Sequence, residues 1–324
     1  MDKSEQQTGQ RDQLDFPVEK GEFVRWESQF RNWITIDGSA GPSGVEGFKA
    51  EADRYHLYVS HACPWAHRTL IYRKLKKLED IISISVVNPK MGSISWDFDE
   101  YPDATGDTLY GAKNLQEIYD KAAGKYEGVV TVPVLWDKQK KTIVNNESSE
   151  IIRMLNSAFD HLTGSEENYY PAKLKNEINE INSFVYDNIN NGVYKTGFAK
   201  TQRAYEKAFD QLFYALDEIE KRLSVQRYLV GDQFTEADLR LFPTLIRFDS
   251  VYVGHFKCNL RRIDDYPNLS NYLREIYQLP GVASTVHMDH IKTHYYWSHT
   301  SINPTRTVPQ GPHINYLSTH NRDN

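Results

Sequence analysis

The chain has 324 residues, 40% of them hydrophobic and 25% charged, which is the composition of a globular protein large enough for more than one domain. Its net charge of −6 leaves no basic surplus to neutralise phosphates, so nucleic-acid binding is disfavoured. No apolar run approaches the roughly 18 residues of a spanning helix, and the polar N-terminus lacks the apolar core of a signal peptide, so we expect a cytoplasmic protein that binds no membrane.

The first predicted segment, residues 1–50, is an extended N-terminal arm with little regular structure. It is largely polar and ends in a glycine-rich stretch at residues 37–44, which favours loops and turns. The arm nevertheless contains more aromatic residues than an unattached tail would carry. We expect these side chains to dock the arm onto the rest of the protein: Phe23, Trp26, Phe30 and Trp33.

Residues 51–160 are predicted to form a small thioredoxin-like domain. Apolar and β-branched runs predict strands at residues 55–59, 81–87, 129–136 and 142–144. Helices are predicted at residues 64–78, at 115–123 within a long Gly- and Asp-rich insertion, and at 147–155. The resulting order, βαβ(α)ββα, is that of an α+β domain in which helices pack on a mixed sheet.

Residues 161–300 are predicted to form an all-helical domain, followed by an extended tail at residues 301–324. The hydrophobic periodicity predicts helices near residues 176–191, 202–223, 235–249 and 267–278. Thr235 and Asp238 have the spacing of a capping box at the start of the third of these helices, and Pro243 lies inside it, where it should introduce a kink.

Cys63 is the residue with the clearest chemical signal. It stands between the first predicted strand and its helix, directly before Pro64, which fits the first position of a helix. Backbone N–H groups at a helix N-terminus stabilise a thiolate, so we expect a lowered pKa and a reactive Cys63. A buried, inert cysteine is the alternative, but this position is poorly suited to filling a core. The other cysteine, Cys258, lacks these features and is expected to be structural.

The motif around Cys63 contains a single thiol. The position at which a dithiol redox enzyme carries its second cysteine is Ala66. No disulfide can therefore form within the motif. Cys63 would instead form a mixed disulfide with an external thiol, which another thiol then resolves.

Two further features are typical of a pocket for a small peptide thiol. Pro133 interrupts a predicted strand, and a cis bond after Val132 would leave the Val132 backbone free to pair with a peptide, although an edge-strand proline explains Pro133 equally well. Glu147 and Ser148 open a helix, where N–H groups and a hydroxyl can hold a carboxylate and the glutamate an ammonium. Simple N-capping explains these two residues as well.

Several longer strings resemble one known family. They are residues 55–68 (YHLYVSHACPWAHR), 131–137 (TVPVLWD), 190–199 (NNGVYKTGFA), 247–258 and 290–304. In this order, before a helical domain, they resemble the glutathionyl-hydroquinone reductases, the Xi class of the glutathione transferases. The resemblance extends over roughly residues 20–312, which is nearly the whole chain.

The resemblance implies an enzyme that removes glutathione from glutathionyl-hydroquinones, with free glutathione as co-substrate and no metal. Cys63 would attack the glutathione sulfur of the substrate, and a second glutathione would resolve the mixed disulfide and release oxidised glutathione. Tyr194 and Tyr296 match the family tyrosines that would donate a proton and hydrogen bonds to the departing hydroquinone. Tyr295 is adjacent to Tyr296 and is the alternative choice.

The same resemblance implies glutathione-binding positions and an assembly. Trp96, Val132, Glu147 and Ser148 match the binding positions of the family. Many members carry Arg or Lys where this chain has Val129, so another donor would have to meet a carboxylate of glutathione. A homodimer is expected from the family alone.

Sequence alone leaves other interpretations open. The same cysteine chemistry would serve an omega-like glutathione transferase that acts as a thioltransferase or dehydroascorbate reductase. A non-catalytic glutathione-binding module is a third interpretation, against which an intact Cys63 argues. His287, His290 and His294 share one helical face, as metal ligands can, but Asp289 would point away from that face. We therefore expect histidines that line a cleft or cap helices, and no metal.

Overall fold

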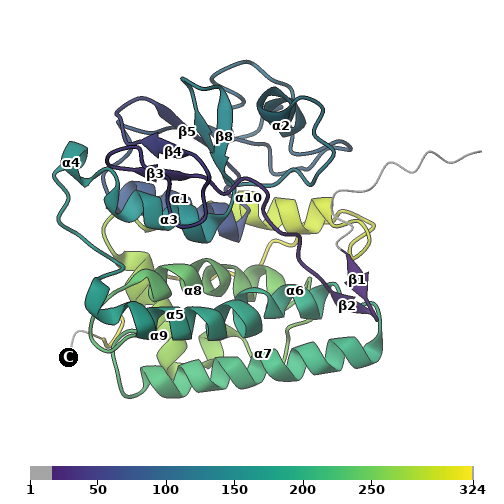
Figure 1. The fold of residues 1–324 in the computed structure, drawn as a ribbon. Helices are drawn as coiled ribbons and strands as arrows, with labels where there is room; N and C mark the ends of the chain where they lie inside the picture. Colours follow the sequence, from purple (N-terminus) through teal and green to yellow (C-terminus); the bar gives the residue numbers. More distant parts are fainter. Residues whose placement is uncertain (1–16, 323–324) are drawn as a thin grey trace, which may run out of the picture.

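The computed structural model describes residues 17–322, so residues 1–16 of the predicted arm and 323–324 of the predicted tail lie outside the described residues. A mixed sheet with its helices forms one half of the molecule, and a bundle of helices forms the other (Figure 1). This arrangement confirms the predicted fold class, a thioredoxin-like domain followed by an all-helical domain.

The sheet consists of four strands in the order β6–β5–β7–β8. β5 (Tyr55–Val59) pairs in parallel with β6 (Ser83–Val86) and antiparallel with β7 (Val134–Asp137). β7 in turn pairs antiparallel with β8 (Thr142–Asn145). All residues of the inner strand β5 are buried, as expected where helices cover both faces of a sheet.

Three helices cover this sheet, at the positions that the sequence predicted. α1 (Pro64–Leu75) and α3 (Ser148–Ser157) lie on the face toward the helix bundle, and α2 (Leu115–Ala123) lies on the other face (Figure 1). A short α4 (Asp160–Thr163), which the sequence did not predict, follows α3. The N-terminal ends of α1 and α3 therefore come together at the boundary with the bundle.

The third strand differs from its prediction. The predicted strand covered residues 129–136, but β7 begins only at Val134. The Val132–Pro133 peptide bond is cis, as the sequence suggested. Proline has no N–H to donate to a neighbouring strand, so ladder pairing starts after it. Residues 129–133 instead run as a loop.

The arm contains more regular structure than we expected. β3 (Trp33–Thr35) pairs in parallel with β4 (Gly47–Lys49), and β1 (Val18–Glu19) forms a hairpin with β2 (Glu22–Phe23) beside the helix bundle (Figure 1). The backbone N–H of Asn32 donates to the carbonyl of Val144, which attaches the arm to the edge strand β8. Residues 17–50 thus contain short strands that the sequence did not predict, while most of the arm is irregular, and an unpaired group at the sheet edge provides a partner for it at Asn32.

The predicted docking aromatics of the arm are mostly in contact with the core. Phe23 is buried, and Phe30 and Trp33 are half-buried against the hydrophobic core. Trp26 is 37% exposed and lies at the margin of the cavity described below. The arm is thus held on both halves of the molecule.

The bundle contains the predicted helices and additional short ones. α7 (Gln202–Leu223) and α9 (Pro267–Gln278) match their predicted limits, whereas α5 and α8 end earlier and continue as π-helical turns. The elements not predicted are short, and most lie beside the longer helices. The bounds of the remaining helices and turns are α5 (Lys175–Val185), η2 (Tyr186–Asn190), α6 (Gly192–Gly197), α8 (Glu236–Arg247), η3 (Phe248–Tyr252), α10 (Met288–Thr293), η6 (His294–Ser298), and the 3₁₀ turns η1 (Ala172–Leu174), η4 (Ile263–Asp265) and η5 (Ala283–Thr285).

α8 is the central helix of the molecule. The predicted capping box is present, since Thr235 Oγ1 accepts from the N–H of Ala237 and Asp238 Oδ2 accepts from the N–H of Thr235 at 2.8 Å. Every residue of α8 is buried, so the helix is covered on all sides. Its last residue, Arg247, lies next to the loop that carries Cys63. Among the helices of residues 17–322, none combines the length and the apolar character needed to cross a membrane.

Candidate active site

Cys63 occupies the turn between β5 and α1. It is the N-cap residue of α1, and Pro64 is the first residue of the helix, as predicted. The backbone N–H groups of Trp65 and Ala66 donate toward its sulfur. The thiol contacts the carbonyl oxygen of Val132, with Sγ and O separated by 3.6 Å. The sulfur therefore faces both the helix N-terminus and the loop before β7.

The protonation of Cys63 differs from our expectation. Burial raises the pKa of its thiol, while the N–H groups of Ala66 and Trp65 and the positive charges of Arg247 and Arg25 act in the opposite direction. The cysteine is only 9% exposed, so the loss of hydration outweighs these favourable interactions. The prediction of a lowered pKa is therefore wrong for this structure, in which burial moves the pKa of the Cys63 thiol upward.

A cavity of about 510 Å³ lies above Cys63, between the two halves of the molecule. Its volume is in the range of small-ligand sites. Both halves and the arm contribute to its lining. Of the residues predicted from the sequence, those that line it are Cys63, Trp96, Val132, Glu147, Ser148 and Tyr194.

One side of the cavity is formed by the thioredoxin-like domain. Ser148 is the first residue of α3 and is buried, so the N-terminus of this helix faces the cavity. The carboxylate of Glu147 accepts from Ser149 N at 3.0 Å and from Ser149 Oγ at 2.9 Å. It therefore caps α3, and because Glu147 also lines the cavity, this capping role is compatible with the predicted contact to glutathione. The ring of Trp96 stacks on His294, with 4.6 Å between the ring centroids.

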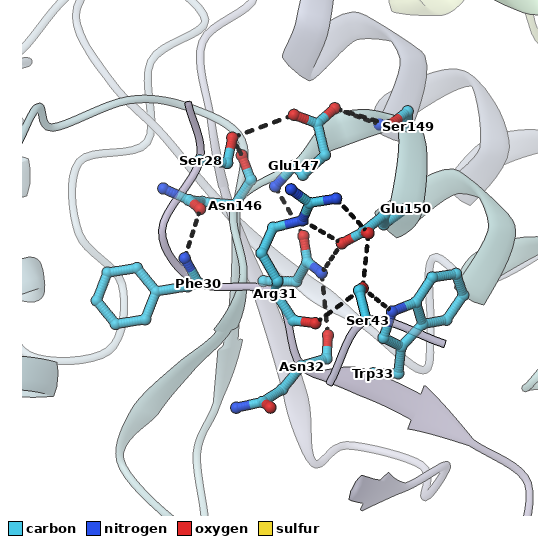
Figure 2. Close-up of polar contacts among 11 residues, drawn as sticks. Ser28, Phe30, Arg31, Asn32, Trp33, Ser43, Asn146, Glu147, Ser149 and Glu150 are labelled. Atoms are coloured by element: carbon cyan, nitrogen blue, oxygen red, sulfur yellow. Dashed lines mark hydrogen bonds and ion pairs between the residues drawn. The ribbon is translucent and has the colours of Figure 1, made fainter. Parts of the chain in front are cut away.

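The arm closes this side through polar contacts with the start of α3 (Figure 2). Ser28 Oγ donates to the Glu147 carboxylate at 3.1 Å. The guanidinium of Arg31 donates to both carboxylate oxygens of Glu150, at 2.7 and 2.5 Å. Val129 lines the cavity as well, and the arginines that line it, Arg25 and Arg31, both come from the arm. The arm thus brings positive charge to the cavity wall.

The opposite side contains a cluster of tyrosine hydroxyls. Tyr194 Oη and Tyr295 Oη are 2.6 Å apart, and Tyr252 Oη lies 3.0 Å from Tyr295 Oη. Tyr194 and Tyr295 line the cavity with Cys63. The cluster therefore presents linked hydroxyl donors to whatever lies beside the sulfur.

Tyr295 takes the place that we predicted for Tyr296. The hydroxyl of Tyr296 is directed to the carbonyl of Ser250 at 3.5 Å, and its ring packs on His255, outside the cavity lining. Neighbouring residues of a helical turn point about 100° apart, so only one of the two can face the cavity. We therefore correct the choice to Tyr295, which sequence spacing could not separate from its neighbour.

Arg247 is a site residue that the sequence gave no means to identify. It is fully buried at the end of α8. Its guanidinium donates to the carbonyls of Ala62 at 2.9 Å and His61 at 3.1 Å, and contacts a ring nitrogen of His67 at 2.9 Å. It thus fixes the two residues before Cys63 and brings a positive charge near the sulfur. A buried cation of this kind depends on contacts between segments far apart in the chain.

The three histidines with metal-ligand spacing are held by different partners. The ring of His287 stacks on His61 with centroids 3.6 Å apart. His290 Nε2 lies 2.5 Å from the carbonyl of Pro102, and His294 Nδ1 lies 3.0 Å from the carbonyl of Pro89. Within residues 17–322, no group of three or more His, Cys, Asp or Glu side chains is arranged to hold a metal ion. These histidines attach α10 and η6 to the thioredoxin-like domain.

These buried histidines predict a loss of stability in acid. Burial lowers the pKa of His61 to about 3 and that of His294 to about 4, and it also lowers the pKa of His290. The unfolded chain therefore takes up protons below about pH 6.5 that the folded protein does not. Each such histidine should reduce the free energy of unfolding by about 1.4 kcal/mol per pH unit between pH 6.5 and its folded pKa. Urea unfolding from pH 7.5 to pH 5 should show this decrease.

A single substitution tests the origin of this acid sensitivity. Asparagine at position 61 has no titratable ring. In His61→Asn the free energy of unfolding should therefore depend less steeply on pH, by the equivalent of about one proton taken up on unfolding. His313, for which the structure shows exposure in the C-terminal tail, provides a control as His313→Asn. An equal slope in the wild type and His61→Asn would show that His61 does not carry the effect.

Comparisons with known proteins agree over most of the chain. The family model for the N-terminal domain of glutathione S-transferases matches residues 62–158, and the model for their C-terminal domain matches residues 202–275. Glutathionyl-hydroquinone reductase YqjG of Escherichia coli is 57% identical over 304 residues, which cover 94% of this chain and 93% of YqjG. Glutathionyl-hydroquinone reductase PcpF of Sphingobium chlorophenolicum is 53% identical over 292 residues, 90% of either chain.

Solved structures show the same similarity. The glutathione-bound structure of YqjG from Escherichia coli superposes with a TM-score of 0.89 and covers 91% of this chain and 96% of that chain. The glutathione S-transferase Xi from Phanerochaete chrysosporium is 53% identical and has a TM-score of 0.87, with 93% of this chain and 96% of that chain covered. At these identities the similarity extends beyond the fold to the family.

Proposed function

The chain belongs to the glutathionyl-hydroquinone reductases, the Xi class of the glutathione S-transferase family, and we propose that Cys63 is the nucleophile with which it removes glutathione from its substrates. It is thus a glutathione-dependent enzyme that reduces glutathionyl-hydroquinones to hydroquinones. One observation supports the assignment most strongly. The Cys63 sulfur lies in a single cavity between the residues predicted to bind glutathione and the hydroxyls of Tyr194 and Tyr295.

Glutathione is proposed to lie along the thioredoxin-like side of the cavity. Its cysteine backbone would pair with the Val132 backbone, beside the carbonyl that is 3.6 Å from Cys63 Sγ. Its γ-glutamyl end would reach Glu147 and Ser148, where the N-terminus of α3 favours a carboxylate and Glu147 an ammonium. Trp96 would contact the glycine end of glutathione. This arrangement directs the glutathione sulfur to Cys63.

The first step transfers the glutathionyl group to Cys63. The Cys63 sulfur attacks the glutathione sulfur, an S–S bond forms, the bond from that sulfur to the ring carbon breaks, and its electron pair goes to the ring carbon. The ring carbon then needs a proton, and the resting Cys63 thiol loses one. A relay through the linked hydroxyls of Tyr194 and Tyr295, 2.6 Å apart, would move a proton in this direction without an external acid. The products are a hydroquinone and a Cys63–glutathione mixed disulfide.

The second step returns the enzyme to its resting form. A free glutathione attacks the glutathione sulfur of the mixed disulfide, Cys63 leaves as a thiol, and oxidised glutathione is released. No second cysteine takes part, because Ala66 occupies the position where a dithiol redox enzyme carries its second cysteine. The net reaction is a two-electron reduction of the substrate by two glutathione sulfurs, one of which the substrate itself supplies.

The assembly is proposed from family membership, and we expect a homodimer. A cytoplasmic location remains the expectation from the sequence. Size-exclusion chromatography with light scattering tests the dimer, and a mass of one chain at micromolar concentration would contradict it.

The test of the proposed function compares two substrates. With free glutathione as reductant, the enzyme should convert a glutathionyl-hydroquinone to the hydroquinone and oxidised glutathione, and mass spectrometry should detect glutathionylated Cys63 during turnover. The mixed disulfide of glutathione and 2-mercaptoethanol serves as the comparison. A strong preference for this disulfide, or for dehydroascorbate, would indicate an omega-like thioltransferase instead.

A further inference from the structure

Arg25 of the arm reaches the cavity from the side of the tyrosines. It lines the cavity with Cys63, and its guanidinium carbon lies 4.5 Å from the ring centroid of Trp65 and 4.9 Å from that of Tyr194. Its Nε donates to Asn191 Oδ1 at 2.6 Å, at the start of α6. The aromatic rings and Asn191 thus hold the guanidinium in one orientation.

Arg25 and Arg31 differ in the partners of their guanidinium groups. Arg31 also lines the cavity, but it forms two hydrogen bonds with the Glu150 carboxylate. Arg25 Nη2, by contrast, is buried and has no hydrogen-bond partner among the described residues. A buried guanidinium N–H without an acceptor is costly, so such a group is expected where a ligand supplies the acceptor.

We propose that Arg25 is a further catalytic residue, which donates hydrogen bonds to a ring oxygen of the glutathionyl-hydroquinone. This inference rests on the proposed function. When the bond between carbon and sulfur breaks, the electron pair left on the ring is shared with the ring oxygens until the carbon accepts its proton. The guanidinium of Arg25 stabilises the negative charge on the oxygen during this interval.

Its position favours the hydroquinone over glutathione as the bound partner. Arg25 contacts Trp65, Tyr194 and Asn191, which lie toward the helix bundle. The predicted glutathione residues Glu147 and Ser148 lie at the start of α3, where the arm contacts Glu147 through Ser28. The arm would then recognise the aromatic half of the substrate. The substrates that fit this site are glutathionyl-hydroquinones with an ionisable ring oxygen.

Two substitutions of Arg25 test the proposal. Arg25→Gln should lower kcat/KM for a glutathionyl-hydroquinone by about 10²–10³-fold, the usual cost of losing one donor to a developing oxyanion. Turnover of the mixed disulfide of glutathione and 2-mercaptoethanol, which releases no ring, should change less than about threefold. Arg25→Lys should recover part of the loss. Across a series of ring substituents, kcat/KM of Arg25→Gln should depend more steeply on the pKa of the departing hydroquinone than kcat/KM of the wild type does.

A third substitution changes the charge without removing the arginine. Asn191→Asp keeps the acceptor for Arg25 Nε but pairs the guanidinium with a carboxylate, so it should reproduce part of the Arg25→Gln loss. Lys207→Gln is the matched control for the arm, because it removes the surface ion pair with Glu22 and leaves Arg25 in place. It should have wild-type activity on both substrates.

The outcomes separate this inference from the proposed function. A wild type without activity on glutathionyl-hydroquinones would contradict the proposed function itself. If the wild type is active, equal losses on both substrates in Arg25→Gln would overturn the role at the ring oxygen. A raised KM for free glutathione would place Arg25 on a carboxylate of glutathione instead. Because Arg25 also lowers the pKa of the Cys63 thiol, a rise in this pKa is expected in Arg25→Gln, and alkylation by iodoacetamide at different pH values measures it. If the loss on the hydroquinone conjugate disappears at a pH above this raised pKa, Arg25 acts only through the thiol and the role at the ring oxygen is overturned.

Discussion

Replacing Cys63 by serine is expected to reduce turnover by a factor on the order of 10⁴ or more, to the limit of detection, while the protein remains folded. A serine hydroxyl cannot form a disulfide, so neither the mixed disulfide with glutathione nor its resolution is available. Residual binding of substrate should persist, since the cavity walls are unchanged. Steady-state turnover with glutathionyl-hydroquinone and isothermal titration with glutathione measure the two effects separately.

Cys258 provides the matched control for this substitution. It is fully buried in the helical half, and its Sγ lies 3.8 Å from the carbonyl of Phe256. Burial raises the pKa of its thiol. Cys258→Ser should therefore lower stability slightly and leave turnover per folded molecule unchanged. Full turnover by Cys63→Ser would exclude every mechanism that passes through a Cys63–glutathione disulfide.

Removing the hydroxyl of Tyr194 or Tyr295 is expected to slow release of the hydroquinone by roughly 10²–10⁴-fold, the usual contribution of a positioned proton donor. The aryl carbon is a poor leaving group unless it accepts a proton, and these linked hydroxyls lie 2.6 Å apart in the cavity. Tyr194→Phe and Tyr295→Phe should each lower kcat for a glutathionyl-hydroquinone. A simple disulfide, whose departing sulfur needs no such acid, should be affected far less.

Tyr296→Phe is the control, because its hydroxyl lies outside the cavity and is directed to Ser250. It should leave kcat for both substrates close to the wild-type value. The double variant of Tyr194 and Tyr295 should lose little more than either single variant, since the two hydroxyls act in one relay. A loss in Tyr296→Phe as large as in Tyr295→Phe would restore the original choice. Equal losses of activity on the simple disulfide would show that the tyrosines do not act as proton donors to the departing hydroquinone.

The raised pKa of Cys63 is compatible with this chemistry. A thiol that rests protonated carries the proton that the aryl carbon finally receives, so the first step needs no net proton from solvent. Arg247 and Arg25 lower the pKa of the sulfur although burial dominates. We therefore expect the thiolate to form in concert with substrate binding and proton transfer. The activity on hydroquinone conjugates should persist below the pKa of the thiol.

Much of the structure follows from short-range rules that act within a few residues. The limits of α2, α7 and α9 match their predictions, and α1 begins at Pro64 after Cys63. Caps, proline positions and hydrophobic periodicity are properties of neighbouring residues, so they can be read along the chain. The same holds for Cys63 as the reactive cysteine candidate, since its placement at a helix N-terminus is local.

The features that sequence reasoning missed depend on atoms from distant segments. β3 and β4 of the arm pair with each other, and the arm meets the edge strand β8 where Asn32 donates to Val144, contacts that only the folded chain brings together. Tyr194 and Tyr295 are separated by roughly 100 residues in the chain, and the folding of the helix bundle brings their hydroxyls together.

The sequence by itself determined the main strands and helices of the two domains and the family, and it predicted Cys63 as the reactive cysteine, because capping, periodicity and motif spacing are encoded by neighbouring residues. Only the tertiary structure decided which tyrosine faces Cys63, that Arg25 and Arg247 lie near its sulfur, and in which direction its pKa moves. Desolvation and Coulomb interactions depend on distances between groups, and folding sets those distances for residues far apart in the chain.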